Sequence, residues 1–264
     1  SGQASDDPGL HAADDRQREI YLSRYKPSDY DFSRTSQDPY FARQVAIRLE
    51  EVRRCYRGGV ALDLCCGAGH YALPLAQHVE RIIGIDFSPE MIEAARKRAA
   101  EQGCGNVVFC VANARHLPLE SASAALVYSF AALYTIPAVE EVVAEVARVL
   151  QPGGVAILEF GALYSLNTLV CRATPGIAGP CHLPLPQIMG ILRRCGLGVE
   201  RDRSFQLLPL WGNRPWWLRP LLHPGWKWLM SREIAGRMLD ERLSSLPLVR
   251  HFAFRHMIIC RKPG

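Results

Sequence analysis

The feature that most constrains the fold is a regular alternation of short apolar runs and amphipathic segments between residues 60 and 160. The short runs are β-branched or apolar and are bounded by turn residues, which is typical of buried parallel strands. The intervening segments have helical periodicity, and the last of them ends at the breaker Gln151–Gly154. The expected strands are Val60–Cys65, Arg81–Asp86, Val107–Ala112, Ala124–Phe130 and Val155–Phe160. Strand–helix–strand units of this length imply right-handed crossovers, and therefore a parallel sheet with helices on both faces.

The rest of the chain adds a leading helix, two interruptions and a final strand. Apolar spacing predicts a helix over residues 38–56, and Phe254–Cys260 is expected to return to the same sheet. We expect residues 38–264 to form one domain, with insertions at about 162–186 and 209–250 that build a lid. The start of the chain, residues 1–19, is polar, so we expect residues 1–37 to be a flexible segment and a candidate cover over a ligand site.

Composition excludes several classes of protein. The 264 residues are 48% hydrophobic, enough for one α/β domain, and the net charge of +5 includes no block of like charges that would indicate a nucleic-acid tail. Nine cysteines without a C-x-x-C pair predict neither a disulfide framework nor a metal site, and favour the reducing cytoplasm. No run of 18 apolar residues predicts a transmembrane segment.

A glycine-containing loop follows the first expected strand, and an acidic residue ends the second. Ligands of open parallel sheets bind at the carboxyl ends of the strands, where this loop, Asp63–Gly69, must lie. Gly67 and Gly69 allow a tight bend and a close approach of the backbone to a ligand. The carboxylate of Asp86 can accept hydrogen bonds from two vicinal ribose hydroxyls. The same glycine spacing, with Ala72 at the third position, also fits a dinucleotide fingerprint, so an NAD(P)-dependent oxidoreductase is the competing interpretation.

Three motifs in order resemble the class I S-adenosylmethionine-dependent methyltransferases. Ala61–Gly69 looks like their first motif, and its double cysteine is similar to the ubiquinone/menaquinone C-methyltransferase group. Ile85–Met91 resembles their second motif, and Leu150–Gly154 resembles the turn before their fifth strand. The resemblance implies a Rossmann-like, doubly wound α/β fold with a mostly parallel seven-stranded sheet and an antiparallel last strand. It also implies S-adenosyl-L-methionine as the cofactor of a methyltransferase.

The same resemblance implies a set of cofactor-binding residues. Gly67 and Gly69 would line the methionine portion, Asp86 would hold the ribose, and Phe87 and Met91 would border the adenine. The complete set is Asp63, Cys65, Gly67, Ala68, Gly69, Asp86, Phe87, Met91, Asn113, Ala114, Ser129 and Phe130.

Two positions of that set depart from the usual family pattern. Cys65 stands where a glycine is more usual, and Asn113 stands where an acid is usual. Asn113 can still accept a hydrogen bond from the adenine amino group through its carbonyl oxygen.

Methyl transfer requires alignment of the nucleophile, the methyl group and the sulfur, and a general base is optional. The catalytic candidates are Tyr134, which follows the fourth strand, and His182, in the first insertion; a packing role is the alternative for each. All five tryptophans lie in the second insertion, and we expect a substrate lid formed by Tyr30, Trp211, Trp216 and Trp217. A satellite core is the alternative for these tryptophans. Interleaved basic residues also suit a membrane interface or stacked nucleotides.

These observations favour methyl transfer to a small apolar acceptor, whether aromatic, quinone-like or lipid-like. The alternatives are an RNA (tRNA) methyltransferase and a non-catalytic cofactor-binding partner protein. The end of the fourth strand, Tyr128–Ala131, lacks the Asn/Asp-Pro-Pro-aromatic motif of exocyclic-amine methyltransferases, which disfavours a nucleic-acid partner. Peripheral contact with a membrane is compatible with the tryptophan-rich insertion.

Overall fold

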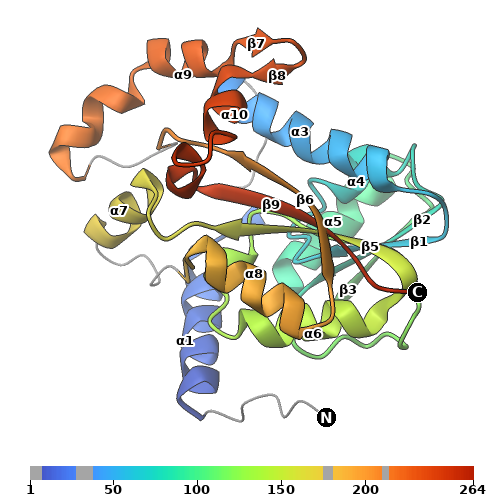
Figure 1. Cartoon of the computed structure of the whole chain (residues 1–264). Coiled ribbons are helices and arrows are strands. Elements are labelled where there is room, and N and C mark those ends of the chain that lie inside the picture. Colours follow the sequence, from blue (N-terminus) through green and yellow to red (C-terminus); the bar gives the residue numbers. More distant parts are fainter. Residues whose placement is uncertain (1–7, 28–37, 175–180, 210–213) are drawn as a thin grey trace.

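A seven-stranded sheet forms the centre of the structure, a computed structural model that describes residues 8–27, 38–174, 181–209 and 214–264 (Figure 1). The strand order is β3-β2-β1-β4-β5-β9-β6. β9 is antiparallel to both of its neighbours, β5 and β6, whereas β1 to β5 pair in parallel. The strands are β1 (Val60–Leu64), β2 (Arg81–Asp86), β3 (Val107–Val111), β4 (Ala124–Ser129), β5 (Leu150–Gly161), β6 (Gly198–Phe205) and β9 (Arg255–Arg261). The expected doubly wound sheet with a reversed last strand is confirmed.

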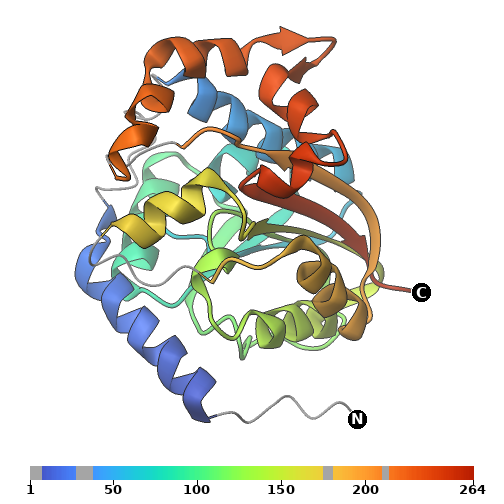
Figure 2. The same cartoon turned by 60° about the vertical axis from the view of Figure 1, so that its left-hand side comes forward.

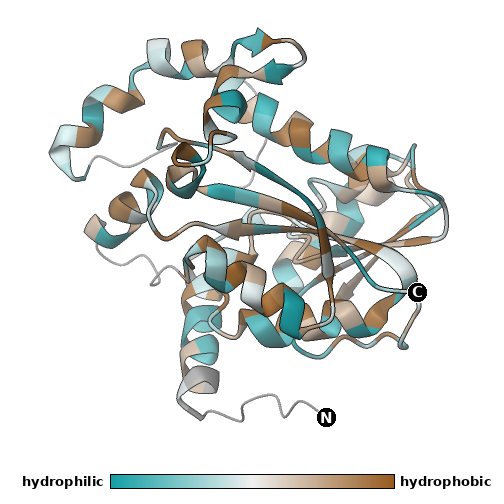
Figure 3. Cartoon of the chain, in the orientation of Figure 1, coloured by the Kyte–Doolittle hydropathy of each residue, from teal (hydrophilic) through white to brown (hydrophobic). Residues whose placement is uncertain are grey.

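Helices cover both faces of this sheet because each buries one apolar stripe. One layer contains α3 (Pro39–Cys55), the short α4 (Ala72–Leu75) and α5 (Pro89–Glu101), and the other contains α6 (Val139–Val149) and α8 (Leu185–Arg194). Helix α5 has a side-chain N-cap, since the Ser88 hydroxyl accepts a hydrogen bond from the Met91 amide. In α6, five valines are buried against the sheet. The parallel strands of the sheet are largely hydrophobic, whereas the edge strand β6 and the outer sides of the helices carry hydrophilic residues (Figure 3).

The beginning of the chain differs from the sequence-based expectation. Residues Pro8–Arg24 form a helix, α1, so the prediction of a flexible segment over residues 1–37 is wrong for this part. The helix is ordered by contacts that its own sequence does not reveal. Asp14 pairs with Arg115 at 3.0 Å, and the ring of Tyr21 lies 5.2 Å from that of Phe87. These contacts hold α1 at the carboxyl end of the sheet.

The two insertions contain helices that gather at the same end of the sheet (Figure 1, Figure 2). The first contributes α7 (Leu166–Ala173). The second contains η3 (Trp216–Leu222), α9 (Pro224–Ser231), the hairpin β7 (Glu233–Ile234) and β8 (Arg237–Met238), α10 (Leu239–Ser244) and η4 (Val249–Phe252). A short turn of 3-10 helix, η2 (Leu133–Thr135), follows β4.

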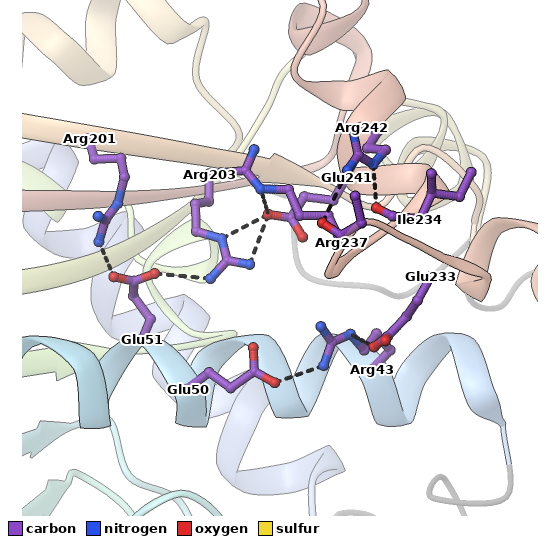
Figure 4. Close-up of polar contacts among 11 residues, drawn as sticks. Arg43, Glu50, Glu51, Arg201, Arg203, Glu233, Ile234, Arg237, Glu241 and Arg242 are labelled. Carbon is purple, nitrogen blue, oxygen red and sulfur yellow. Dashed lines mark hydrogen bonds and ion pairs between the residues drawn. The ribbon is translucent and has the colours of Figure 1, made fainter.

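A network of ion pairs fastens the second insertion to α3 and β6 (Figure 4). Arg203 on β6 bridges Glu51 of α3, at 3.0 Å, and Glu241 of α10, at 2.8 Å. Arg43 of α3 reaches Glu233 of the hairpin at 3.0 Å. Glu51 and Glu241 are almost wholly buried, so their two pairs with Arg203 are screened little by solvent. These ion pairs therefore hold the second insertion in place against α3 and β6.

None of the described helices is both long enough and apolar enough to cross a membrane.

A buried cluster of three charged residues lies at the end of β5. The Arg48 guanidinium binds the Glu159 carboxylate through two hydrogen bonds of 2.6 and 3.0 Å, and Arg255 lies 3.1 Å from the same carboxylate. Burial by itself disfavours the ionised carboxyl, but the two guanidinium groups outweigh it and hold the pKa of Glu159 below its usual value. Removing this carboxylate would leave two cations buried without their counter-ion.

Glu159→Gln should therefore lower the free energy of unfolding by about 3–5 kcal/mol, the cost of breaking a buried pair. Urea unfolding measures this change. The matched control is Glu140→Gln, which removes the exposed pair with Arg194 and should cost about 0–1 kcal/mol. Because the folded pKa of Glu159 is lowered, its contribution is complete above the unfolded pKa of about 4.3 and is lost as pH falls through the folded value. Equal effects of the two substitutions would contradict the assignment.

Candidate functional site

The loop between β1 and α4 bends sharply at the carboxyl edge of the sheet. Gly67 and Gly69 have φ angles of +52° and +79°, a region that favours glycine. The Cys66 amide donates to the Ile85 carbonyl at 2.9 Å, which ties the loop to the end of β2. A side chain at Gly69 would meet the ring of Phe109 at 2.9 Å, so the close packing of loop and sheet also requires glycine there.

Cys65, where a glycine is more usual in the family, has a φ angle of +60°. A non-glycine residue in this region costs about 1–2 kcal/mol. The loop therefore keeps the backbone that a glycine would adopt, and the cysteine carries the strain. Burial raises the pKa of the Cys65 thiol, with the Asp86 and Asp63 carboxylates adding to the effect, so this thiol stays protonated at neutral pH.

Asp86 lies at the tip of β2 and faces the loop. One carboxylate oxygen accepts from the Gly67 amide and the other from the Ser88 amide, each at 2.9 Å. A carboxylate has about four acceptor positions, so both oxygens keep capacity for a further donor. Burial raises the pKa of Asp86 in spite of these hydrogen bonds. Burial likewise raises the pKa of Asp63, and the neighbouring Asp86 carboxylate adds to it.

These residues fit S-adenosylmethionine on two observations. A Cβ placed on Gly67 would meet no protein atom within 4 Å, so the loop is open on the side where a ligand would approach. The acceptor capacity of Asp86 suits a pair of ribose hydroxyls. Gly67, Gly69 and Asp86 would hold the cofactor. Among the described residues, no group of three or more histidine, cysteine and acidic side chains could hold a metal ion.

The adenine side of the expected site is bordered by α1. Phe87 is half-buried, and the Arg18 guanidinium lies 5.2 Å from its ring centre, beside the contact with Tyr21. Met91 is fully buried within α5. Ala68 is fully buried as well, beneath the loop. Helix α1 is thus placed where it covers the side of the site formed by β2 and Phe87.

Asn113 and Ala114 follow the end of β3, at the carboxyl edge of the sheet. The Asn113 side-chain oxygen accepts from the Arg115 amide at 3.1 Å, and Ala114 is buried. Arg115, which sequence reasoning missed, binds both Asp14 of α1 and Glu141 of α6. No sequence signal marks this bridge, because its three residues are far apart in the chain.

The expected methionine side of the site is formed by the end of β4. Ser129 and Phe130 are buried, and the ring of Phe130 packs against Tyr71 at 5.0 Å. Ser129 is paired in register with Leu158 of β5. The last residue of β5, Gly161, is therefore three positions beyond this pair, at the same edge of the sheet.

The structure brings the two catalytic candidates, Tyr134 and His182, together around Gly161. Their rings lie 5.7 Å apart, and Phe254 contacts both, at 5.3 and 4.9 Å. A Cβ on Gly161 would lie within 3.0 Å of all three side chains, so only glycine permits this cluster. The Arg255 guanidinium lies 4.5 Å from the centre of the Tyr134 ring. We call Tyr134, Gly161, His182 and Phe254 the aromatic cluster.

His182 has one ring nitrogen bonded and the other without a partner. Nδ1 lies 2.7 Å from the Thr168 hydroxyl, and that hydroxyl donates its proton to the Ala162 carbonyl at 2.8 Å. Nδ1 must therefore donate, which leaves Nε2 as an acceptor; it is buried and has no hydrogen-bond partner among the described residues. Burial, helped by Arg255 and Arg172, lowers the pKa of His182 to about 3, so the imidazole is neutral at neutral pH.

The expected lid is only partly within the described residues. Tyr30 and Trp211 lie outside them. Trp216 and Trp217 are exposed, and so are Trp226 and Trp228, so these four tryptophans do not form a satellite core. Whether Trp216 and Trp217 cover an acceptor stays a prediction.

The part of the chain that is similar to known proteins contains the glycine loop and Asp86. Residues 61–154 match the family described as a methyltransferase domain. The chain is 38% identical over 96 residues to the demethylmenaquinone methyltransferase of Lactococcus lactis, covering 35% of this chain and 38% of the relative. It is 33% identical over 122 residues to that of Geobacillus kaustophilus, covering 44% of this chain and 52% of the relative. The chain thus spans about half or less of these relatives.

Solved structures extend the likeness to most of the fold. The YcgJ protein of Bacillus subtilis superposes with a TM-score of 0.59 at 20% identity, over 84% of this chain and 99% of that one. At this level of identity the likeness concerns the fold. The matched sequence covers the glycine loop, Asp86 and β4, whereas His182, Phe254 and both insertions lie beyond it.

The cofactor assignment predicts the effect of Asp86→Asn. Replacing the carboxylate by a neutral amide should weaken binding of S-adenosylhomocysteine by about 1.5–3 kcal/mol, because hydrogen bonds to a charged group are lost. Isothermal titration calorimetry measures this change, with the exposed Glu90→Gln as the control. Because the pKa of Asp86 is raised, affinity of the unsubstituted protein should fall with decreasing pH already above the ordinary aspartate value of about 3.9. Unchanged affinity in Asp86→Asn, or tighter binding of NAD(H), would reject the assignment.

Proposed function

We propose that this protein, which carries a class I S-adenosylmethionine-dependent methyltransferase domain, transfers a methyl group to a small apolar acceptor of aromatic, quinone-like or lipid-like character. The observation that carries this proposal is the buried Nε2 of His182, which has no hydrogen-bond partner in the part of the chain that the structure describes and lies within the aromatic cluster. The methyltransferase domain indicates S-adenosylmethionine as the methyl donor, and the aromatic cluster supports an apolar methyl acceptor.

The composition of the cluster favours an apolar, flat acceptor. Tyr134 and Phe254 supply aromatic rings, which give large contact area at low conformational cost. A buried acceptor atom such as Nε2 is costly when it has no partner. A hydroxyl or enol group on the methyl acceptor would donate a hydrogen bond to Nε2. The same hydrogen bond would orient the oxygen, or the adjacent carbon, that receives the methyl group.

The bound cofactor would supply an electrophilic methyl group, and the residues of this chain supply position and a dry environment. Gly67, Gly69 and Asp86, which lie within the segment that matches the methyltransferase domain, would fix the donor at the ends of β1 and β2. The aromatic cluster stands at the ends of β4 and β5, one strand further along the sheet. Such alignment provides most of the rate in a direct displacement.

The role of His182 in this proposal is to accept a hydrogen bond from the molecule that receives the methyl group. Its lowered pKa makes it a weak base, so it orients a proton-bearing acceptor better than it removes the proton in a separate step. Thr168 fixes the tautomer through Nδ1, and Gly161 leaves room for the ring. Tyr134 adds a phenol at the same place.

The test is production of S-adenosylhomocysteine from S-adenosylmethionine with a panel of phenols, hydroxyquinones, apolar lipids, amines, thiols and RNA. We expect turnover with phenols or hydroxyquinones. His182→Phe, which keeps an aromatic ring but removes Nε2, should lower kcat by about 10²-fold or more, the usual size of a proton-transfer or orienting effect. Affinity for S-adenosylhomocysteine should be unchanged.

The matched control is His78→Phe, at an exposed position remote from the cluster, which should leave kcat unchanged. Turnover with RNA alone would support the RNA methyltransferase alternative. Tight cofactor binding without turnover of any acceptor would support the non-catalytic alternative.

A further inference from the structure

The second insertion carries an exposed, tryptophan-rich segment that the cofactor and acceptor sites do not use. We call residues 214–232, which comprise η3 and α9, the tryptophan arm. Its four tryptophans are unusually exposed: Trp216 to 76%, Trp217 to 51%, Trp226 to 48% and Trp228 to 55%. Side chains of this size are seldom left in water together unless the surface binds something.

The exposure of these rings does not come from a poorly attached segment. The arm has its own buried residues, Leu218 and Met230, and Lys227 pairs with Asp38 ahead of α3 at 2.8 Å. Directly after the arm, the hairpin β7–β8 is fixed to α3 by the ion pair between Glu233 and Arg43 (Figure 4). The arm is therefore anchored to the rest of the molecule, and its tryptophans are exposed in spite of this anchoring.

The charge of the arm has a single sign. It contains four basic residues and no acidic residue; the basic residues are Arg214, Arg219, Lys227 and Arg232. Three of them, all arginines, are exposed. The Arg232 guanidinium lies 4.9 Å from the centre of the Trp228 ring, so cation and indole occupy one patch. Indole rings and cationic side chains on the same face are typical of segments that lie in the headgroup region of an anionic bilayer.

We propose that the tryptophan arm docks on the surface of a membrane that contains anionic lipids. A lipid surface fits better than single-stranded nucleic acid, because the exposed Leu229 beside the rings suits acyl chains and gives no stacking surface. One face of Trp228 is also taken by Arg232. The arginines would contact lipid phosphates, and the indoles would enter the interface.

The arm lies at the same end of the sheet as α1 and α7, the end where the strands β4 and β5 finish (Figure 1, Figure 2). Docking would therefore bring that end of the molecule to the bilayer. If the proposed function holds, an apolar acceptor could be taken directly from the membrane. Docking itself does not rest on methyl transfer, and its test uses no activity measurement.

The experiment is co-sedimentation of the full chain with vesicles of phosphatidylcholine alone and of an equimolar mixture with phosphatidylglycerol. We expect binding to the anionic vesicles, weaker binding to the neutral ones, and a decrease with added salt. The double variant Trp216→Ser, Trp217→Ser should weaken binding to the anionic vesicles about tenfold or more, because apolar area no longer leaves water. Arg214→Gln should weaken it about fivefold.

The matched controls are Val108→Ser, an exposed apolar residue on the edge strand β3, and Lys97→Gln, an exposed cation on α5. Both should bind vesicles as the unsubstituted protein does, and thermal melting should show that all variants are folded. Equal binding to neutral and anionic vesicles, or unchanged binding by the tryptophan variant, would overturn the proposal. Binding of a labelled single-stranded RNA without any vesicle binding would also overturn it and would assign the arm to nucleic acid.

Discussion

The Glu159 carboxylate is the interaction on which the acceptor side of the molecule depends. It binds Arg48 of α3 and Arg255 of β9, and it accepts from the Ala131 amide at 3.1 Å, just after β4. One buried anion thus joins a helix, the reversed strand and the loop that leads to Tyr134. Since two cations share it, the cluster is stable only when all three groups are in place. Its position beside Gly161 connects the stability of the fold to the shape of the candidate site.

The sequence predicts β1 to β4 to within one residue, whereas β5 begins at Leu150, five residues before the expected Val155, and includes the segment Gln151–Gly154 that was expected to be a turn. β2 agrees with the expected Arg81–Asp86, because β-branched runs between turn residues have few alternatives in a chain of this pattern. The position of the glycine loop beside the end of β2 could be predicted for the same reason, since strand ends determine where a loop can lie. The antiparallel direction of β9 was implied by family resemblance alone.

The remaining features depend on contacts between distant residues. Helix α1 is mostly polar, and its contacts with Arg115 and Phe87, which are distant in the sequence, explain its order. Glu159 carried a signal that was overlooked, because a charged residue inside an apolar strand must have a partner. The meeting of Tyr134 with His182 and Phe254 has no signature in the sequence, because it arises from the packing of three separate loops around Gly161.

We expect the donor bound at Asp86 to point toward the aromatic cluster. A crystal structure of the protein with S-adenosylhomocysteine measures this directly. The ribose hydroxyls should lie on the Asp86 carboxylate, and the sulfur should face Tyr134 and His182. A ligand bound away from Asp86, or a sulfur directed away from these two residues, would show that the cofactor loop and the aromatic cluster do not form one active site.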